Sequence, residues 1–183
     1  MIRALGDKRP RIHPAAFVSE AAYVIGDAEI GEGATIWPGV VIRADFNRIV
    51  IGAGTHVEDN SVLHAVPAPL VIGQGCTIGH GVVVHAERIG DHCMIANGST
   101  VLDGVVVGDW SMIGAGSLVT PRMQIPPRSL VFGNPAEVQG EIRPHHEERL
   151  RRAGEVHIEM SRRYVELGLA ADISEFAIAA EAR

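Results

Sequence analysis

Three histidines in the middle of the chain, His64, His80 and His85, are the residues whose type and placement could do chemistry. A neutral imidazole binds zinc, and three imidazoles with an open fourth position are the ligand set of a catalytic rather than a structural zinc site. Such an ion lowers the pKa of a bound water toward ~7 and supplies hydroxide at neutral pH. Zinc is therefore the expected cofactor, although the same ligands also suit Fe(II), Co(II) or Ni(II).

A repeat of six residues predicts the framework that positions these histidines. Ile, Val or Leu recurs at every sixth position, and a second, mostly small series follows each of these residues by four. The large series comprises Ile12, Val18, Val24, Ile30, Ile36, Ile42, Ile51, Val57, Leu63, Ile72, Ile78, Val84, Ile89, Ile95, Val101, Val107, Ile113 and Val119. This period suits a solenoid of short strands, in which three hexapeptides make a triangular coil of about 18 residues. Stacked coils would bury both series.

The sequence therefore predicts a mainly β fold, with a parallel β-helix domain over residues 1–140 and a helical tail over residues 141–183 packed on it. Pro144 suits the first turn of a helix, apolar residues then recur every three or four positions to Leu167, and Gly168 is a plausible stop. A second short helix is expected from Ser174 to Ala182.

Counting coils places two of the three histidines in one column. The residues one step after the large aliphatic residue on the third face include Arg43, His64 and His85. His64 and His85 are 21 residues apart, which is one coil of 18 plus a three-residue insertion between Leu63 and Ile72. Adjacent coils lie about 4.8 Å apart, as neighbouring strands do. Two imidazoles at that distance can share one metal ion.

His80 belongs to a different face, in a column with Asp59 and Asn97. A three-fold oligomer would bring this face of one subunit against the histidine column of the next. We therefore predict a homotrimer with three interfacial sites, each built from three histidines. The other histidines show no such convergence and are expected to be surface or packing residues; they are His13, His56, His92, His145, His146 and His157.

The chain resembles γ-class carbonic anhydrase-like proteins of the hexapeptide-repeat family, and more closely their short bacterial subgroup. The resemblance is carried by "RADFNRIVIG", "THVEDNSVLHA", "IGHGVVVHA", "GSTVLDG" and "FGNPAEV". It implies a left-handed β-helix and a metal at the trimer interface, bound by His64 and His85 of one chain and His80 of its neighbour. It also implies reversible hydration of CO2 to bicarbonate by metal-bound hydroxide.

The resemblance implies roles for four more residues. Arg43 and Asp45 match the family's Arg-x-Asp, whose arginine pairs with an acid across the interface and helps place bicarbonate. Asp59 matches the acid of a Gln-Asp pair, while Glu58 stands in place of the glutamine. A carboxylate there adds charge and could act as a base.

The acidic loop that carries a proton-shuttling glutamate in the best-known form of the family is absent, because only "AVPAPL" follows His64. A positioned titratable group speeds export of the proton from metal-bound water. We therefore expect slow CO2 hydration from this chain.

Three other functions use the same repeat. The metal could hydrolyse a thioester such as an acyl-CoA. An acyltransferase would need a histidine base that binds no metal, such as His56 or His92. A non-catalytic trimeric binding protein would keep the solenoid without using His80.

Composition narrows the remaining partners and the compartment. A formal net charge of -6 argues against nucleic acid. No segment approaches the ~20 apolar residues of a membrane span, and the basic start lacks a signal peptide's apolar core, so we expect a cytoplasmic protein without a membrane partner. Cys76 and Cys93 occupy matching positions of adjacent coils, within reach of a disulfide. In the cytoplasm they are expected to be reduced core residues.

Overall fold

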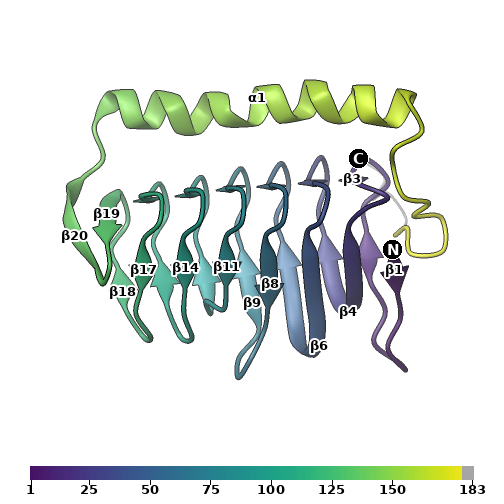
Figure 1. Ribbon diagram of the computed structural model, residues 1–183, viewed down its shortest axis with the longest axis horizontal. Helices are drawn as coiled ribbons and strands as arrows, with labels where there is room; N and C mark the ends of the chain where they lie inside the picture. Colours follow the sequence, from purple (N-terminus) through teal and green to yellow (C-terminus); the bar gives the residue numbers. More distant parts are fainter. Residues whose placement is uncertain (179–183) are drawn as a thin grey trace.

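The computed structural model describes residues 1–178 and consists of a β-solenoid with one long helix lying along it (Figure 1). The elements are β1 (Ile2–Arg3), β2 (Arg11–Ile12), β3 (Phe17–Val18), β4 (Tyr23–Ile30), β5 (Thr35–Ile36), β6 (Val41–Ile51), β7 (His56–Val57), β8 (Val62–His64), β9 (Leu70–Ile72), β10 (Thr77–Ile78), β11 (Val83–Val84), β12 (Arg88–Ile89), β13 (Met94–Ile95), β14 (Thr100–Val101), β15 (Val106–Val107), β16 (Met112–Ile113), β17 (Leu118–Val119), β18 (Gln124–Ile125), β19 (Ser129–Gly133), β20 (Ala136–Glu141) and α1 (Pro144–Glu166). The predicted fold class, a parallel β-helix of hexapeptide repeats with a C-terminal helix, is confirmed.

The strands form two sheets that enclose the core. An 8-stranded sheet runs β20-β19-β16-β13-β10-β7-β5-β3, and a 12-stranded sheet holds the rest. All of the pairs are parallel except β19 with β20. The larger sheet covers two sides of the prism because β4 and β6 are long enough to continue around a corner. The slip in the repeat between Ile42 and Ile51 therefore lies within one continuous strand.

The repeat predicts the core correctly. Every residue of the large aliphatic series is at most 1 % exposed. The residues four positions later are buried with it, apart from the partly exposed Ala16 and Met123 and the exposed Phe46, Pro67 and Arg88 at the slips in the repeat. Cys76 and Cys93 belong to this series and are free thiols in the core, as expected. Burial of apolar surface stabilises a fold by about 25 cal/mol per Å², so this aliphatic interior is the main source of stability.

Helix α1 crosses the outer surface of the 8-stranded sheet along the whole solenoid (Figure 1). It begins at Pro144, where the Arg143 backbone N–H donates to the side chain of His146. Leu150 packs with Met94 and Met112 in a small apolar cluster outside the main core. Gly168 follows the helix with a φ of +72°, which agrees with the predicted stop.

The chain after α1 returns to the first coil and pairs with it. The backbone N–H of Ile12 donates to Phe176 at 2.9 Å, and that of Ile178 donates to Ile12 at 3.0 Å. Ala171 donates in the same way to Val18. Residues 174–178 therefore form a turn and a β-bridge, and the helix expected from Ser174 is wrong over these residues. The remainder of that predicted helix lies outside the described residues.

Gly26 is required where β4 passes β6. It has a φ of +88°, and a Cβ there would lie 2.1 Å from the carbonyl oxygen of Ala44. We expect Gly26→Ala to lower the free energy of unfolding by about 3 kcal/mol or more, because strain and a backbone clash add. Gly33→Ala is the matched control, since Gly33 has a φ of +65° but open space around it. Its cost should be about 1 kcal/mol. If chemical denaturation gave the same loss of unfolding free energy for both variants, the clash at Gly26 would be contradicted.

Candidate metal centre

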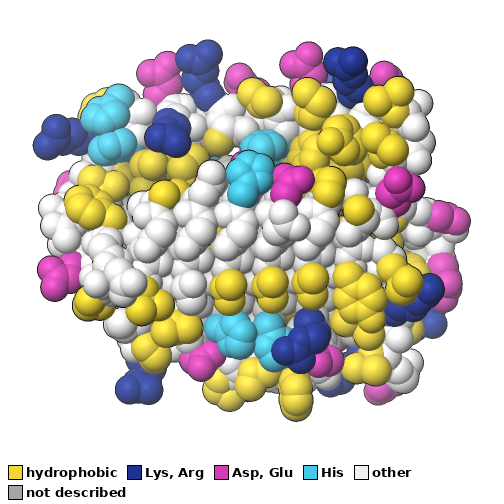
Figure 2. All heavy atoms as spheres, viewed as in Figure 1, with side chains coloured by type: hydrophobic (Ala, Val, Ile, Leu, Met, Phe, Trp, Pro, Cys, Tyr) yellow, Lys and Arg dark blue, Asp and Glu magenta, His cyan; other side chains and the backbone are white. Residues whose placement is uncertain are grey.

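His64 and His85 lie on adjacent coils, as the column argument predicts. His64 ends β8 and pairs with Arg43 of β6, while His85 follows β11. The two ring centroids are 5.0 Å apart, with the rings nearly perpendicular. The histidines on the face shown in Figure 2 gather in separate groups, and those along its lower edge lie beside basic and acidic side chains. The pairing of β6, β8 and β11 therefore places the imidazoles of His64 and His85 next to each other.

Arg43 and Asp45 contact the buried ring of His64. Nη2 of Arg43 lies 3.1 Å from Nδ1, and Oδ1 of Asp45 lies 3.1 Å from Nε2. Arg43 also pairs with Asp45 at 2.7 Å. Burial and the charge of Arg43 lower the pKa of His64 below its usual value, against the opposing effect of Asp45. His64 is thus neutral at pH 7, the protonation state that binds a metal.

Asp103 is a site residue that the sequence interpretation missed. Its Oδ1 lies 3.1 Å from Nδ1 of His85. A carboxylate behind a histidine fixes the ring and its tautomer, and metal-binding histidines commonly have such a partner. This contact leaves Nε2 of His85 available to a metal. The signal was present in the spacing, because Asp103 lies 18 residues, one coil, after His85.

His80 follows β10 and is held by two carboxylates of its own chain. Nε2 lies 2.9 Å from Glu58, and Nδ1 lies 3.1 Å from Asp59. The backbone N–H of His80 donates to Asn97, which agrees with the predicted Asp59, His80, Asn97 column. The side chain of His80 is 55 % exposed, but both ring nitrogens are engaged within this chain, so a metal shared with a neighbouring molecule would take the place of one carboxylate.

Glu58 is a buried carboxylate with two histidine partners. Its other oxygen lies 2.9 Å from Nε2 of His157 on α1, so Glu58 bridges His80 and the helix. Burial alone would raise the pKa of Glu58, but the hydrogen bond from His157 and the charges of His80 and His157 outweigh it and lower that pKa. Glu58 is therefore ionised at neutral pH. The interpretation of His157 as a surface or packing residue missed this contact.

His56 is also more specific than the packing residue that the sequence indicated. It is 1 % exposed and stacks on His157 with ring centroids 4.9 Å apart. Trp37 Nε1 donates to Thr35, and the Thr35 hydroxyl lies 2.8 Å from His56 Nδ1. Burial, with a smaller effect of His157, lowers the pKa of His56 to about 4. A buried, neutral histidine therefore supports the helix side of the site.

Within one chain, the three predicted metal ligands do not come together. Across residues 1–178, no three His, Cys, Asp or Glu side chains form a group that could hold a metal ion. The stacked pair of His64 and His85 nevertheless has donors that suit a divalent ion, because both side chains are imidazoles on one column and the Asp103 contact leaves Nε2 of His85 available. An ion bound to His64 would take the place of Arg43 or Asp45 at one ring nitrogen. A third ligand must come from outside this pair.

The comparisons with known proteins place the fold in a family. The family model "Bacterial transferase hexapeptide (six repeats)" matches residues 9–44 and 88–121. The chain is also 38 % identical over 143 residues to a carbonic anhydrase of Geobacillus kaustophilus, covering 78 % of this chain and 79 % of that protein. The chain therefore belongs to the hexapeptide-repeat family and, within it, to the γ-class carbonic anhydrase-like proteins.

Two other relatives are longer than this chain, and one of them is not named as a carbonic anhydrase. Mitochondrial gamma carbonic anhydrase 1 of Arabidopsis thaliana is 42 % identical over 137 residues, which are 71 % of this chain. The chain spans about half the length of that relative. The carnitine operon protein CaiE of Escherichia coli is 34 % identical over 128 residues, covering 69 % of this chain and 65 % of that protein.

Solved structures give the same fold with transferase descriptions. A Bacillus cereus protein provisionally assigned as an acetyltransferase has a TM-score of 0.87 and 35 % identity, covering 90 % of this chain and 96 % of that one. A hexapeptide transferase family protein of Anaplasma phagocytophilum has a TM-score of 0.81 at the same identity, covering 85 % and 92 %. The carbonic anhydrase relatives imply a metal cofactor, whereas these structures leave the reaction open. Among the described residues, no helix is long and apolar enough to cross a membrane.

Proposed function

We propose that this protein is a metal-dependent, carbonic anhydrase-like enzyme that interconverts CO2 and bicarbonate at sites shared between the subunits of a homotrimer. The observation that carries the proposal is the stack of neutral His64 on His85 beside Arg43 and Asp45. The carbonic anhydrase relatives support it. Each site would take its third ligand, His80, from the adjacent subunit, and zinc is the preferred metal.

Each side chain has a role that follows from its contacts. A bound divalent ion would supply hydroxide at neutral pH. Asp45 and Asp103 orient the rings of His64 and His85. Arg43 keeps its positive charge next to His64, where it can attract and place the bicarbonate anion. Asp59 holds the ring of His80 through Nδ1.

Glu58 is the proton acceptor that the chain itself offers. Its carboxylate is ionised and contacts His80 through one oxygen and His157 through the other. A proton accepted by Glu58 would pass to His157, whose side chain is 21 % exposed and reaches the surface. A carboxylate can accept a proton from a reacting water, whereas the glutamine usual at this position cannot. This proton path is short and lacks a mobile acidic loop, which agrees with the slow CO2 hydration expected from the sequence.

The proposal is tested by metal analysis and stopped-flow CO2 hydration on protein purified without oxygen. We expect about one metal ion per subunit and hydration above that of His64→Ala, which should lose most of its metal, because removing one of three ligands opens the site. His13→Asn, on the first coil, should match the wild type. Stoichiometric metal with hydration no faster than His64→Ala, under both reducing and oxidising conditions, would reject the proposal.

Thioester hydrolysis by the same ion is the second candidate. The solved relatives with transferase descriptions favour an acyl substrate. Screening acyl-CoAs for thiol release separates it from CO2 hydration. Hydrolysis that disappears in His64→Ala would support it, and no release from any acyl-CoA would reject it.

A further inference from the structure

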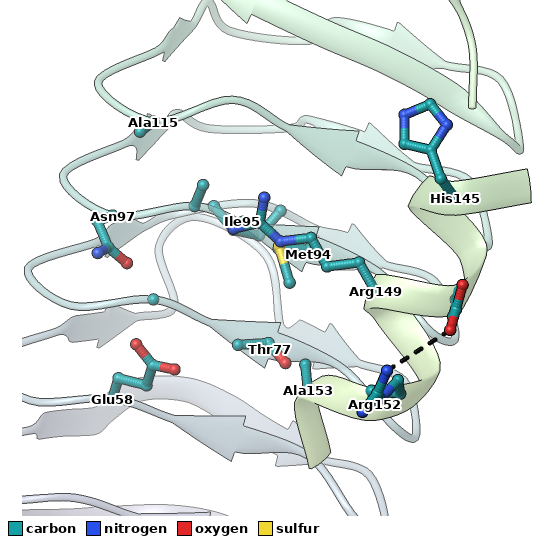
Figure 3. Close-up of a pocket in the computed structure, with 13 residues that line it drawn as sticks. Glu58, Thr77, Met94, Ile95, Asn97, Ala115, His145, Arg149, Arg152 and Ala153 are labelled. Atoms are coloured by element: carbon teal, nitrogen blue, oxygen red, sulfur yellow. Dashed lines mark ion pairs between the residues drawn. The ribbon is translucent and has the colours of Figure 1, made fainter. Parts of the chain in front are cut away.

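A groove lies between α1 and the 8-stranded sheet, next to the loop that carries His80. Its volume is about 700 Å³. Figure 3 shows the helix on one side and successive coils on the other, with side chains from both directed into the space between them. Of the residues given a role in the proposed reaction, only Glu58 lines this groove, at one end.

The floor of the groove is apolar and elongated. Met94 of β13 and the partly exposed Ala96 form its middle, Ala115 lies at one end, and Glu58 at the other. Glu58 follows β7 and Ala115 follows β16, and the ladder β7-β10-β13-β16 separates them by three strand spacings. At about 4.8 Å per spacing the floor is about 14 Å long. This shape fits an extended chain rather than CO2 alone.

The helix side of the groove is cationic. Arg149 and Arg152 line it from the second and third turns of α1, together with Glu148 and the imidazole of His145. Arg152 pairs with Glu148 at 3.6 Å, whereas Arg149 has no ion-pair partner in the part of the chain that the structure describes. The N-terminal end of a helix adds positive potential. Arg149 therefore gives the helix side of the groove an excess positive charge.

Glu58 makes the two ends different. Its carboxyl group lies at the end next to His80, so an anionic group is disfavoured there and attracted toward Arg149. A linear molecule with one anionic end can lie in the groove in only one favourable direction. Its apolar part would cover Met94 and Ala96, and its other end would point toward Glu58.

We propose that this groove binds a linear organic anion, with a carboxylate or phosphate group at Arg149 and an apolar chain that extends along Met94 toward His80. Binding in the groove requires no metal. That the end near His80 is the reacting end of a substrate rests on the proposed function above. The groove would then extend the substrate class of this site beyond CO2, to molecules that carry an acyl chain.

Isothermal titration of the full chain with octanoate, octyl phosphate and 1-octanol tests the proposal. We expect the better of the two anions to bind at least about ten-fold more tightly than the alcohol, which is the contribution of one charge-assisted contact. Arg149→Gln should remove this preference. Arg162→Gln is the matched control, because Arg162 is exposed on the same helix but lies outside the groove. The tighter of the two anions identifies the headgroup.

A second measurement locates the ligand. The methyl resonance of 13C-labelled Met94, assigned with Met94→Leu, should shift when the anion binds. Equal affinity for anion and alcohol, an equal effect of Arg149→Gln and Arg162→Gln, or an unmoved Met94 signal would each overturn the proposal. The titrations are run on metal-loaded and chelator-treated protein. Equal binding in both preparations would support the groove, and the absence of hydratase activity in the metal-loaded preparation would separately count against the proposed reaction, so the two failures are distinguishable.

Discussion

Mixing His64→Ala subunits with His80→Ala subunits restores about one quarter of the wild-type sites, although each variant alone is inactive. The reason is that each interfacial site takes His64 and His85 from one chain and His80 from its neighbour. In a random mixture, about one interface in four combines an intact pair with an intact His80. Metal bound per subunit and CO2 hydration, measured after subunits have been exchanged by denaturation and refolding, both report the recovery.

The control mixture combines His64→Ala with His85→Ala. Both residues belong to the same stacked pair, with ring centroids 5.0 Å apart in one chain. No arrangement of these two variants rebuilds a complete site, so neither metal nor activity should return. Equal recovery in the two mixtures, or none in the first, would contradict a site shared between subunits.

The free energy of unfolding falls by about 3 kcal/mol between pH 6.5 and pH 4 because of His56 alone. Its pKa is lowered from 6.5 to about 4 in the folded protein, chiefly by burial. The unfolded chain therefore binds a proton in this window that the folded chain resists. The contribution is fully present above pH 6.5 and is lost as the pH falls. Each pKa unit corresponds to about 1.4 kcal/mol.

The variant that tests this prediction is His56→Asn, which cannot titrate but keeps an acceptor for the Thr35 hydroxyl. Its unfolding free energy should depend less on pH between 6.5 and 4 than that of the wild type, at one fixed protein concentration. His13→Asn should leave the slope unchanged. His64 contributes in the same direction, and Glu58 contributes at lower pH because its pKa is lowered from 4.5. An identical slope in His56→Asn would show that burial does not resist its protonation.

The repeat made the solenoid and the histidine column predictable from the sequence. Each coil is determined by contacts one coil away, so counting residues along the chain was enough to identify the neighbours of His64 and His85. The same counting could have given Asp103. Asp59 and Asn97 were placed beside His80 in this way, and both contact it.

The contacts of α1 could not be predicted by counting. The helix pattern predicted an amphipathic helix but not which residue of the solenoid each turn would meet. His157 meets both Glu58 and His56 because α1 docks along the 8-stranded sheet, about 100 residues away in sequence from those strands. Glu58 was expected to add charge and to be a possible base, and the structure shows two histidine partners for it that counting did not predict.

The pairing of residues 170–178 with the first coil also controls how copies of this protein meet. A solenoid ends in a strand edge whose N–H and C=O groups match the other end of an identical molecule. On the last coil β20 covers only the edge of β19, whereas the backbone of Ile12 and Val18 on the first coil is already engaged by Phe176, Ile178 and Ala171. Head-to-tail growth into filaments needs both ends of the solenoid, so the covered first coil is enough to block it. Two sides of the prism, which α1 does not cover, are left as the surfaces through which a closed assembly can form.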